Sequence, residues 1–191
     1  MATSNVQIAN LALQKLGQSR KLESLTQDHP NARTLNLAFE PVRDALLRKY
    51  AWSFAIKRES VAEDATDVSY VSDWNRYSLP NDFLRLLRED ETGIETDWKI
   101  EGLYILSRDS SPLEFRYVAK ITDPTYFDSC FVEALACELA LQCCEEITQS
   151  TSKYDRIEAA RDLAVAEAKN IGAIEKPSED QPEDDWIAAR R

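Results

Sequence analysis

The amino-acid sequence predicts a mainly α-helical fold with a small β part: a bundle of about four helices, a small antiparallel sheet and an extended C-terminal arm. Three observations support this prediction. In four segments, apolar residues recur at every third or fourth position, which is typical of helices with one buried face. Between the second and third of these segments, residues 52–120 carry Tyr, Trp, Ile and Val at strand-like positions. Residues 174–191 show no apolar periodicity until close to their end.

Length, composition and charge restrict the class of protein. A chain of 191 residues with 43% hydrophobic content can bury the core of one domain, which we place at residues 1–173. The formal net charge of −11 argues against binding of DNA through neutralisation of its phosphates. No basic stretch precedes the N-terminal apolar residues, and no run of about 18 apolar residues occurs, so we expect a soluble intracellular protein without signal peptide or membrane span.

The first two helices are predicted at residues 4–16 and 31–50. Ser4 is a suitable N-cap for the first helix, and Gly17 can end it in the left-handed conformation. The second helix has apolar residues at spacings of three and four and ends in basic residues, which suit the negative end of the helix dipole. Pro41 lies in its interior and removes a hydrogen bond, so we expect a kink or a break into two shorter helices.

Two aromatic residues, Trp52 and Phe54, follow the second helix. Together with Ile56 they alternate with small and polar residues, which predicts a strand with one buried face. Our main interpretation is that the two rings lock the sheet onto the helices, because large aromatic side chains bury extensive apolar area. A role in a protein interface is the alternative.

The middle of the chain predicts a small antiparallel sheet. Gly102 separates two strand-like runs and is expected to form a hairpin turn. The acidic runs 61–69 and 89–97 lack the glycine-punctuated spacing of a calcium loop, so we interpret them as solvated loops. The predicted strand segments are 69–80, 97–107 and 112–120.

Two further helices are predicted at residues 124–149 and 153–171. Asp123 is a suitable cap for the first of them, and Gly172 is expected to end the second. The helix at 124–149 is apolar or small on nearly all sides, so we expect it to be the central helix of the bundle.

The cysteines, the histidine and the glycines predict neither a metal site nor a catalytic site. The cysteines are spaced along one helix so that they cannot bridge one another, and we expect buried free thiols in a reducing compartment. The chain has four glycines, all at predicted breaks, and they form no phosphate-binding loop. We therefore expect no enzyme and no cofactor. The cysteines are Cys130, Cys137, Cys143 and Cys144.

Residues 174–191 form the predicted C-terminal arm. The segment EKPSEDQPEDDWIAARR contains two prolines and six carboxylates, and it has too little apolar surface to fold alone. One interpretation is a disordered, solvated tail. The other is a docking arm, because Trp186 and Ile187 are typical interface anchors, and Arg190 and Arg191 add a terminal pair of positive charges.

Several segments follow one another in a recognisable order: IANLALQKLG, NARTLNLAFEPVRDALLRKYAWSFA, YSLPNDFLRL and then two C-terminal helices. Over about residues 4–172 this order resembles the head-to-tail adaptor of short-tailed bacteriophages, the tail tubular protein A family. None of the segments is a catalytic signature, so the resemblance depends on their order and spacing. The residues that carry it are Leu11, Leu13, Leu16, Gly17, Asn31, Ala32, Trp52, Phe54, Leu79, Pro80, Asp82, Phe83 and Leu84.

The resemblance implies an architectural function. It implies a helical bundle with a β extension that forms a ring of twelve beneath the portal protein. The other side of the ring would meet the tail nozzle, a tail tubular protein B-like partner, and tail fibres or spikes. It also implies a place in the virion tail after assembly in the host cytoplasm, with double-stranded DNA passing through without specific binding and no membrane involved. An acidic lumen would let the duplex slide.

Two other classes of function remain open. One is a monomeric helical protein-binding module that uses the acidic arm as a ligand. The other is a small hydrolase that uses His29 as a base, but no serine or cysteine motif accompanies this residue. A histidine in a loop before proline is more typical of turn chemistry.

Overall fold

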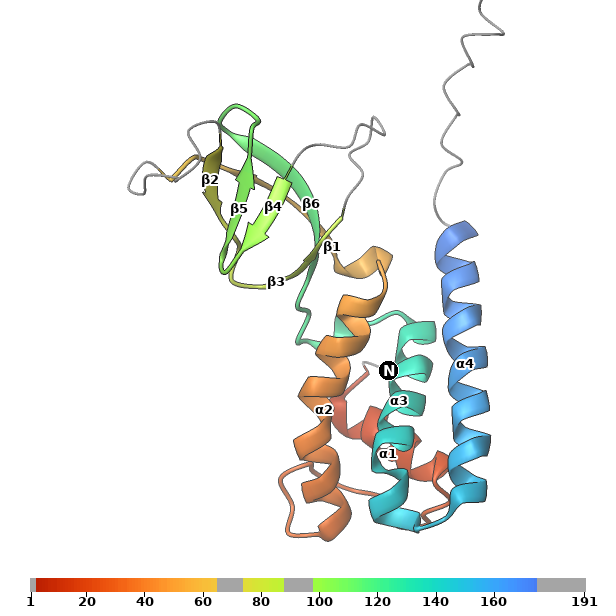
Figure 1. The fold of residues 1–191 in the computed structure, drawn as a ribbon. Helices are drawn as coiled ribbons and strands as arrows, with labels where there is room; N and C mark the ends of the chain where they lie inside the picture. The colour runs from red at the N-terminus through yellow and green to blue at the C-terminus, as the bar shows by residue number, and fades with distance from the viewer. Residues whose placement is uncertain (1–2, 65–73, 88–97, 175–191) are drawn as a thin grey trace, which may run out of the picture.

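The computed structural model describes residues 3–64, 74–87 and 98–174, and in this part of the chain a helical bundle is joined at one end to a β subdomain (Figure 1). Among these residues, four α-helices form the bundle and six strands form two three-stranded antiparallel sheets. The architecture is therefore α+β, and the predicted mainly helical fold with one small sheet is wrong. The strands are four to seven residues long, too short for the alternation of apolar residues to reveal their number.

Helix α1 (Asn5–Lys15) has the predicted start and end. The Ser4 hydroxyl accepts a hydrogen bond from the Gln7 backbone N–H, and the Gln7 side chain accepts one from the Ser4 N–H, which completes a capping box. Gly17 follows with a φ of 72°, the left-handed conformation that glycine adopts without strain. Both predictions for this helix are confirmed.

Helix α2 (Pro30–Lys49) runs without interruption through Pro41, so the predicted break into two helices is wrong. Pro41 has no backbone N–H to donate to the carbonyl group of Leu37. Because Pro41 lies on the exposed side of α2, water can hydrate this carbonyl group instead. His29 caps the helix, because its Nδ1 accepts a hydrogen bond from the Asn31 N–H.

The predicted strand at Trp52 does not form. Ser53–Ala55 make a 3-10 turn, η1, and strand β1 begins only at Ile56. Trp52 and Phe54 both point into the bundle, and the Trp52 indole N–H donates a hydrogen bond to the Leu46 carbonyl at 3.0 Å. The 3-10 turn lets both rings reach the same core. The alternation of these aromatic residues with small and polar residues does not distinguish such a turn from a strand.

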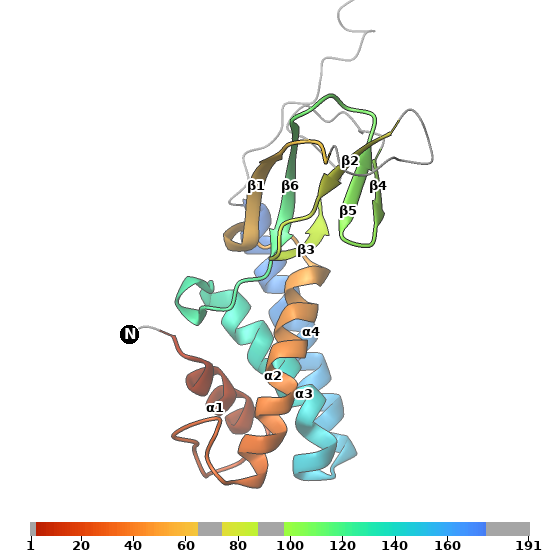
Figure 2. The same cartoon turned by 90° about the vertical axis from the view of Figure 1, so that its left-hand side faces the viewer.

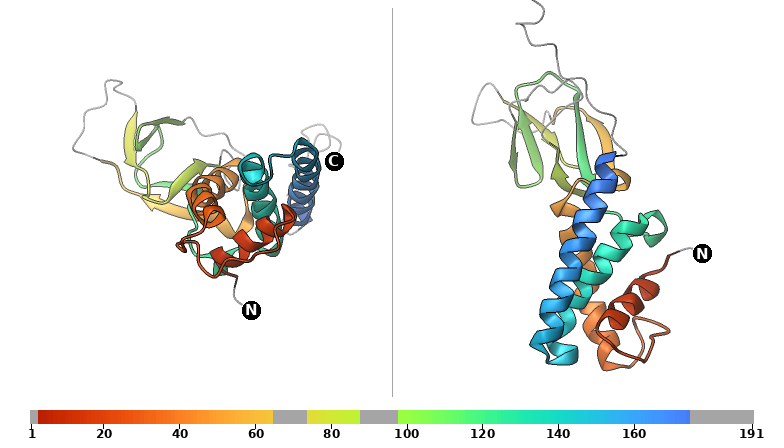
Figure 3. Two further views of the ribbon diagram at one scale, coloured as in Figure 1. Left: turned by 90° about the horizontal axis from the view of Figure 1, so that it is seen from below. Right: turned by 90° about the vertical axis from the view of Figure 1, so that its right-hand side faces the viewer.

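Helix α3 (Ser129–Thr148) is the central helix, as expected. It packs against α1, α2 and α4 (Figure 3), and most of its apolar side chains are fully buried. Its start differs from the prediction: Asp123 caps a separate 3-10 turn, η2 (Pro124–Tyr126), and Asp128 caps α3 itself.

Helix α4 (Thr151–Ile174) is longer than predicted, since it continues past Gly172. The glycine has no positive φ there, so the predicted stop is wrong. Lys153 at the start of α4 donates a hydrogen bond to the Leu16 carbonyl at 3.0 Å, which joins α4 to the end of α1.

The two sheets pack face to face over a second hydrophobic core (Figure 2). Gly102, with a φ of 61°, turns the hairpin between β4 and β5, as predicted. The strand segments predicted at 69–80, 97–107 and 112–120 contain every described strand except β1 and β3. The loops expected at 61–69 and 89–97 lie largely outside the described residues. One sheet has the order β1 (Ile56–Val61), β6 (Leu113–Ala119), β3 (Phe83–Leu86), and the other has the order β2 (Asn75–Ser78), β5 (Tyr104–Ser107), β4 (Trp98–Glu101).

Truncation of Trp52 should destabilise the whole fold. Trp52→Ala removes the ring contacts and the hydrogen bond to Leu46 and leaves a cavity, so we expect the free energy of unfolding to fall by about 3–5 kcal/mol in urea denaturation. Tyr126→Ala is the control, because Tyr126 is an aromatic residue of the neighbouring turn that is 68% exposed, and it should cost less than about 0.5 kcal/mol. A Trp52→Ala protein of normal stability would refute the core assignment.

Candidate interaction surfaces

The residues singled out from the sequence serve the fold in different places. Leu13 and Ala32 are buried in the bundle core, while Gly17 and Asn31 lie at helix ends. The motif residues Leu79, Pro80, Asp82 and Phe83 lead into β3, at the junction of the β subdomain with the bundle. Trp186, Ile187, Arg190 and Arg191 lie outside the described residues.

Trp52 and Phe54 belong to an aromatic cluster at the junction. We use this name for Tyr50, Trp52, Phe54, Phe127 and Phe131. Phe131, from the first turn of α3, is at its centre: its ring centroid lies 4.9 Å from that of Trp52, 5.1 Å from that of Phe54 and 5.0 Å from that of Phe127. These edge-to-face contacts join the end of α2, the start of β1 and the start of α3.

Asp82 is the centre of a polar network within the junction. Its carboxylate accepts hydrogen bonds from the Lys57 ammonium at 2.6 Å and the Tyr117 hydroxyl at 2.9 Å. Burial by itself would raise the pKa of Asp82, but these two donors outweigh it and hold that pKa below its ordinary value. Burial and the neighbouring carboxylate both raise the pKa of Tyr117, so this hydroxyl stays a donor. The network therefore fixes β1, β3 and β6 to one another.

A second polar group links α2 to the β subdomain. Asp44 lies 2.8 Å from Lys120, which follows β6, and 2.8 Å from the buried guanidinium of Arg43. Arg48, one turn later, donates a hydrogen bond to the Leu84 carbonyl of β3. These contacts could not be predicted from the sequence, because charged residues near a helix end are equally typical of a solvated face.

Two apolar surfaces remain exposed on opposite sides of α3. The first is a groove of about 430 Å³ between α2 and α3, lined mainly by apolar side chains of α2. Leu37, at its edge, is 81% exposed. The second is a stripe on α4 formed by Ala159, Leu163 and Ala166, with Leu163 73% exposed. We call them the α2/α3 groove and the α4 stripe; α2 and α4 occupy opposite edges of the bundle in Figures 1 and 3.

A positively charged surface covers the outer face of the sheet β2–β5–β4. The guanidinium carbon of Arg76 lies 3.3 Å from the Tyr104 ring centroid. Lys99 and Arg108 lie 4.7 and 5.0 Å from the ring centroid of Trp74. Cation–π contacts hold these side chains in fixed positions on a chain whose net charge is negative.

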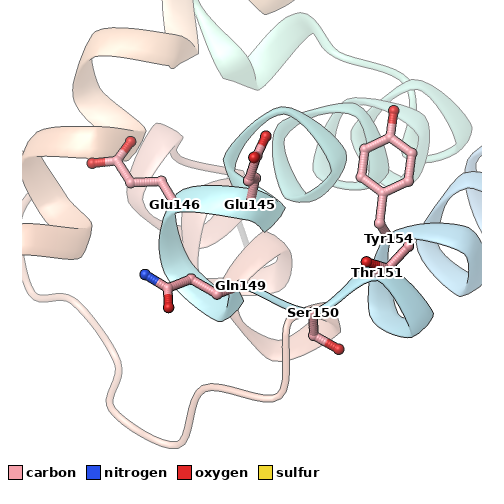
Figure 4. A pocket seen from close by; sticks show the side chains of 6 residues that line it. All are labelled: Glu145, Glu146, Gln149, Ser150, Thr151 and Tyr154. Carbon is pink, nitrogen blue, oxygen red and sulfur yellow. The ribbon is translucent and has the colours of Figure 1, made fainter.

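A pocket at the turn between α3 and α4 has an acidic and polar lining (Figure 4). Figure 4 shows Glu145 and Glu146 on α3 and Tyr154 on α4, with Gln149, Ser150 and Thr151 between them. The pocket is open to solvent, and within the described ranges no three His, Cys, Asp or Glu side chains are arranged to hold a metal ion.

His29 and the cysteines have structural roles in the described part of the chain. His29 uses its Nδ1 to cap α2, which agrees with turn chemistry. All four cysteines are free thiols, and three are buried. Burial raises the pKa of Cys143 to about 11, so that this thiol stays protonated at neutral pH.

Comparison with known proteins adds no relative. No protein-family model matches the sequence, and no curated protein matches it. Among the described residues, no helix combines the length and the apolar character that crossing a bilayer requires.

Replacing Asp82 should weaken the fold in a pH-dependent way. Because the pKa of Asp82 is lower in the folded than in the unfolded protein, its ionised form stabilises the fold above its ordinary pKa of 3.8, and this contribution is lost as the pH falls below that value. We expect Asp82→Asn to lower the free energy of unfolding by about 1–2 kcal/mol at pH 7.

Urea denaturation at pH 7 and pH 3 checks this prediction. The difference between wild type and Asp82→Asn should shrink at the lower pH, because protonation of the Asp82 carboxylate removes part of its contribution to the stability of the fold. Asp155→Asn, a substitution on the exposed part of α4, is the control and should have little effect at either pH. An Asp82→Asn difference that is the same at pH 7 and pH 3 would argue against a charged network.

Proposed function

We propose that the protein is a structural connector, a head-to-tail adaptor whose copies form a ring between a phage portal protein and the tail nozzle. The observation that carries this proposal is the presence of two different apolar surfaces, the α2/α3 groove and the α4 stripe, on opposite sides of α3. Two different surfaces on one chain favour head-to-tail contacts between copies, and such contacts generate a closed ring when the rotation from one copy to the next closes. The motif order described above supports the same assignment.

The heights of the two surfaces are compatible with a ring. Helices α2 and α4 both start at the same end of the bundle and run in the same direction (Figure 1). Pro41 in the groove and Leu163 in the stripe lie about 16 and 18 Å from the starts of their helices, at 1.5 Å per residue. A ring whose axis follows the helices keeps every residue at the same height in each copy, so the stripe of one copy meets the groove of the next.

Charge supports the same pairing. Arg156 lies one turn before Ala159 on the exposed side of α4. At the corresponding end of the α2/α3 groove is Glu146, which accepts a hydrogen bond from Thr34 at 2.8 Å. In a head-to-tail contact, Arg156 of one copy faces Glu146 of the next, and opposite charges at an interface fix its register.

The β subdomain supplies a separate surface for other partners. It lies beyond one end of the bundle (Figure 1), away from the α2/α3 groove and the start of α4. We assign its face to the tail nozzle and to fibres or spikes, since this part of the protein lies apart from the surfaces proposed for contacts between copies. The negative net charge is compatible with DNA sliding through the ring.

A charge on the α4 stripe should prevent ring assembly. Leu163→Glu places a carboxylate in the apolar contact between copies but should leave the fold intact, because Leu163 is exposed. Mixed with the cognate portal and imaged by electron microscopy, wild type should form rings and Leu163→Glu should not. Leu103→Glu is the matched control: Leu103 is 76% exposed at the tip of the β4–β5 hairpin, and ring formation should persist. Rings of normal appearance with Leu163→Glu would refute the interface.

The C-terminal arm is proposed as the portal contact. In each copy, Trp186 and Ile187 would bind weakly, but a ring of copies gives high avidity. Trp186→Ala should therefore reduce capture by immobilised portal sharply, with circular dichroism confirming a retained fold. Capture should be compared at two salt concentrations, because salt would screen and weaken the charged contacts of Arg190 and Arg191. Undiminished capture of Trp186→Ala would remove the arm from the portal contact.

A further inference from the structure

A groove of about 250 Å³ lies beside the aromatic cluster, between the chain that leaves α2 and the last turns of α4. The proposed ring contact does not use it. Trp52 is 7% exposed and closes the floor, while Tyr50 and Phe54 are half-buried and line the sides. The side chains that shape the groove are Tyr50, Trp52, Phe54, Ala168, Lys169 and Ile171.

The rim of the groove carries positive charge. The Lys169 ammonium lies 4.0 Å from the ring centroid of Tyr50, and that of Lys49 lies 5.6 Å from the same centroid. Asp128 also lines the groove, but its carboxylate already accepts a hydrogen bond from the Cys130 N–H at 2.7 Å as the cap of α3. The site therefore suits a bulky apolar side chain with carboxylates next to it.

The chain carries such a segment close by. The described residues end at Ile174, one turn beyond Ile171 in the wall of the groove. Residues 184–187 read Asp-Asp-Trp-Ile, with two carboxylates directly before the aromatic residue. The connection from residue 174 to residue 186 can span at most about 40 Å when extended, and a flexible chain of that length keeps its ends about 20 Å apart. The segment is thus long enough to fold back.

We propose that this groove binds the C-terminal segment of its own chain, with the Trp186 ring against Tyr50 and Phe54 and with Asp184 and Asp185 facing Lys169 and Lys49. The tether keeps the segment at an effective concentration in the millimolar range, so that even a weak contact is occupied. This proposal concerns the free protein and does not depend on the identity of its partner. In a connector, portal binding would compete with the groove for Trp186.

Nuclear magnetic resonance of the full-length protein tests the docking. The chain has four tryptophans, and loss of one indole N–H signal in Trp186→Phe assigns Trp186. We expect the heteronuclear Overhauser effect of this signal to match those of the folded Trp74 and Trp98 in wild type. In Lys169→Glu it should fall to the value of an unfolded chain, because the reversed charge repels Asp184 and Asp185.

Two further variants separate docking from folding. Lys21→Glu makes the same charge change at an exposed position of the loop between α1 and α2, which does not line the groove, and should leave the Trp186 signal unchanged. Replacing Asp184 and Asp185 together by asparagine should weaken docking without touching the bundle. A mobile Trp186 indole in wild type, or one that Lys169→Glu does not alter, would overturn the proposal. A signal that changes with protein concentration would also overturn it, because that result indicates docking between copies.

Discussion

The contact of the Phe131 ring with Trp52, Phe54 and Phe127 is the interaction on which the other parts of this structure depend. Three segments meet there: the chain leaving α2, the turn before α3 and the first turn of α3 itself. The rings therefore link the end of α2 and the turn before β1 to the start of α3. Two of these rings, those of Trp52 and Phe54, also line the groove beside α4, so that one cluster both holds the fold and shapes a surface.

Around this apolar contact, the junction is made of charged residues. Asp82 with Lys57 and Tyr117 joins strands of the β subdomain, while Asp44 with Lys120 joins α2 to it. Hydrogen bonds to charged groups require defined geometry, whereas apolar packing tolerates sliding. The combination gives the β subdomain a fixed orientation on the bundle.

The distribution of surfaces follows from the position of α3. Because α3 occupies the middle of the bundle, its apolar side chains are buried in the core, and the outer sides of α2 and α4 are exposed to solvent. The exposed leucines on these two helices, Leu37 and Leu163, would be covered in the head-to-tail ring proposed above, and the β subdomain would remain available at one end of the bundle.

Features that depend on a few neighbouring residues could be predicted from the amino-acid sequence. The cap at Ser4, the end at Gly17, the hairpin at Gly102 and the buried character of α3 were all predictable, because hydrogen bonds or helical periodicity within one turn create them. Trp52 and Phe54 were also recognised as important. Their conformation was decided by tertiary structure, since both rings turn toward Phe131, far along the chain. Pairings such as Ile56 with Val118 leave no local trace, so the α+β architecture, the Asp82 network and the two opposed apolar surfaces emerged only when distant segments were brought together.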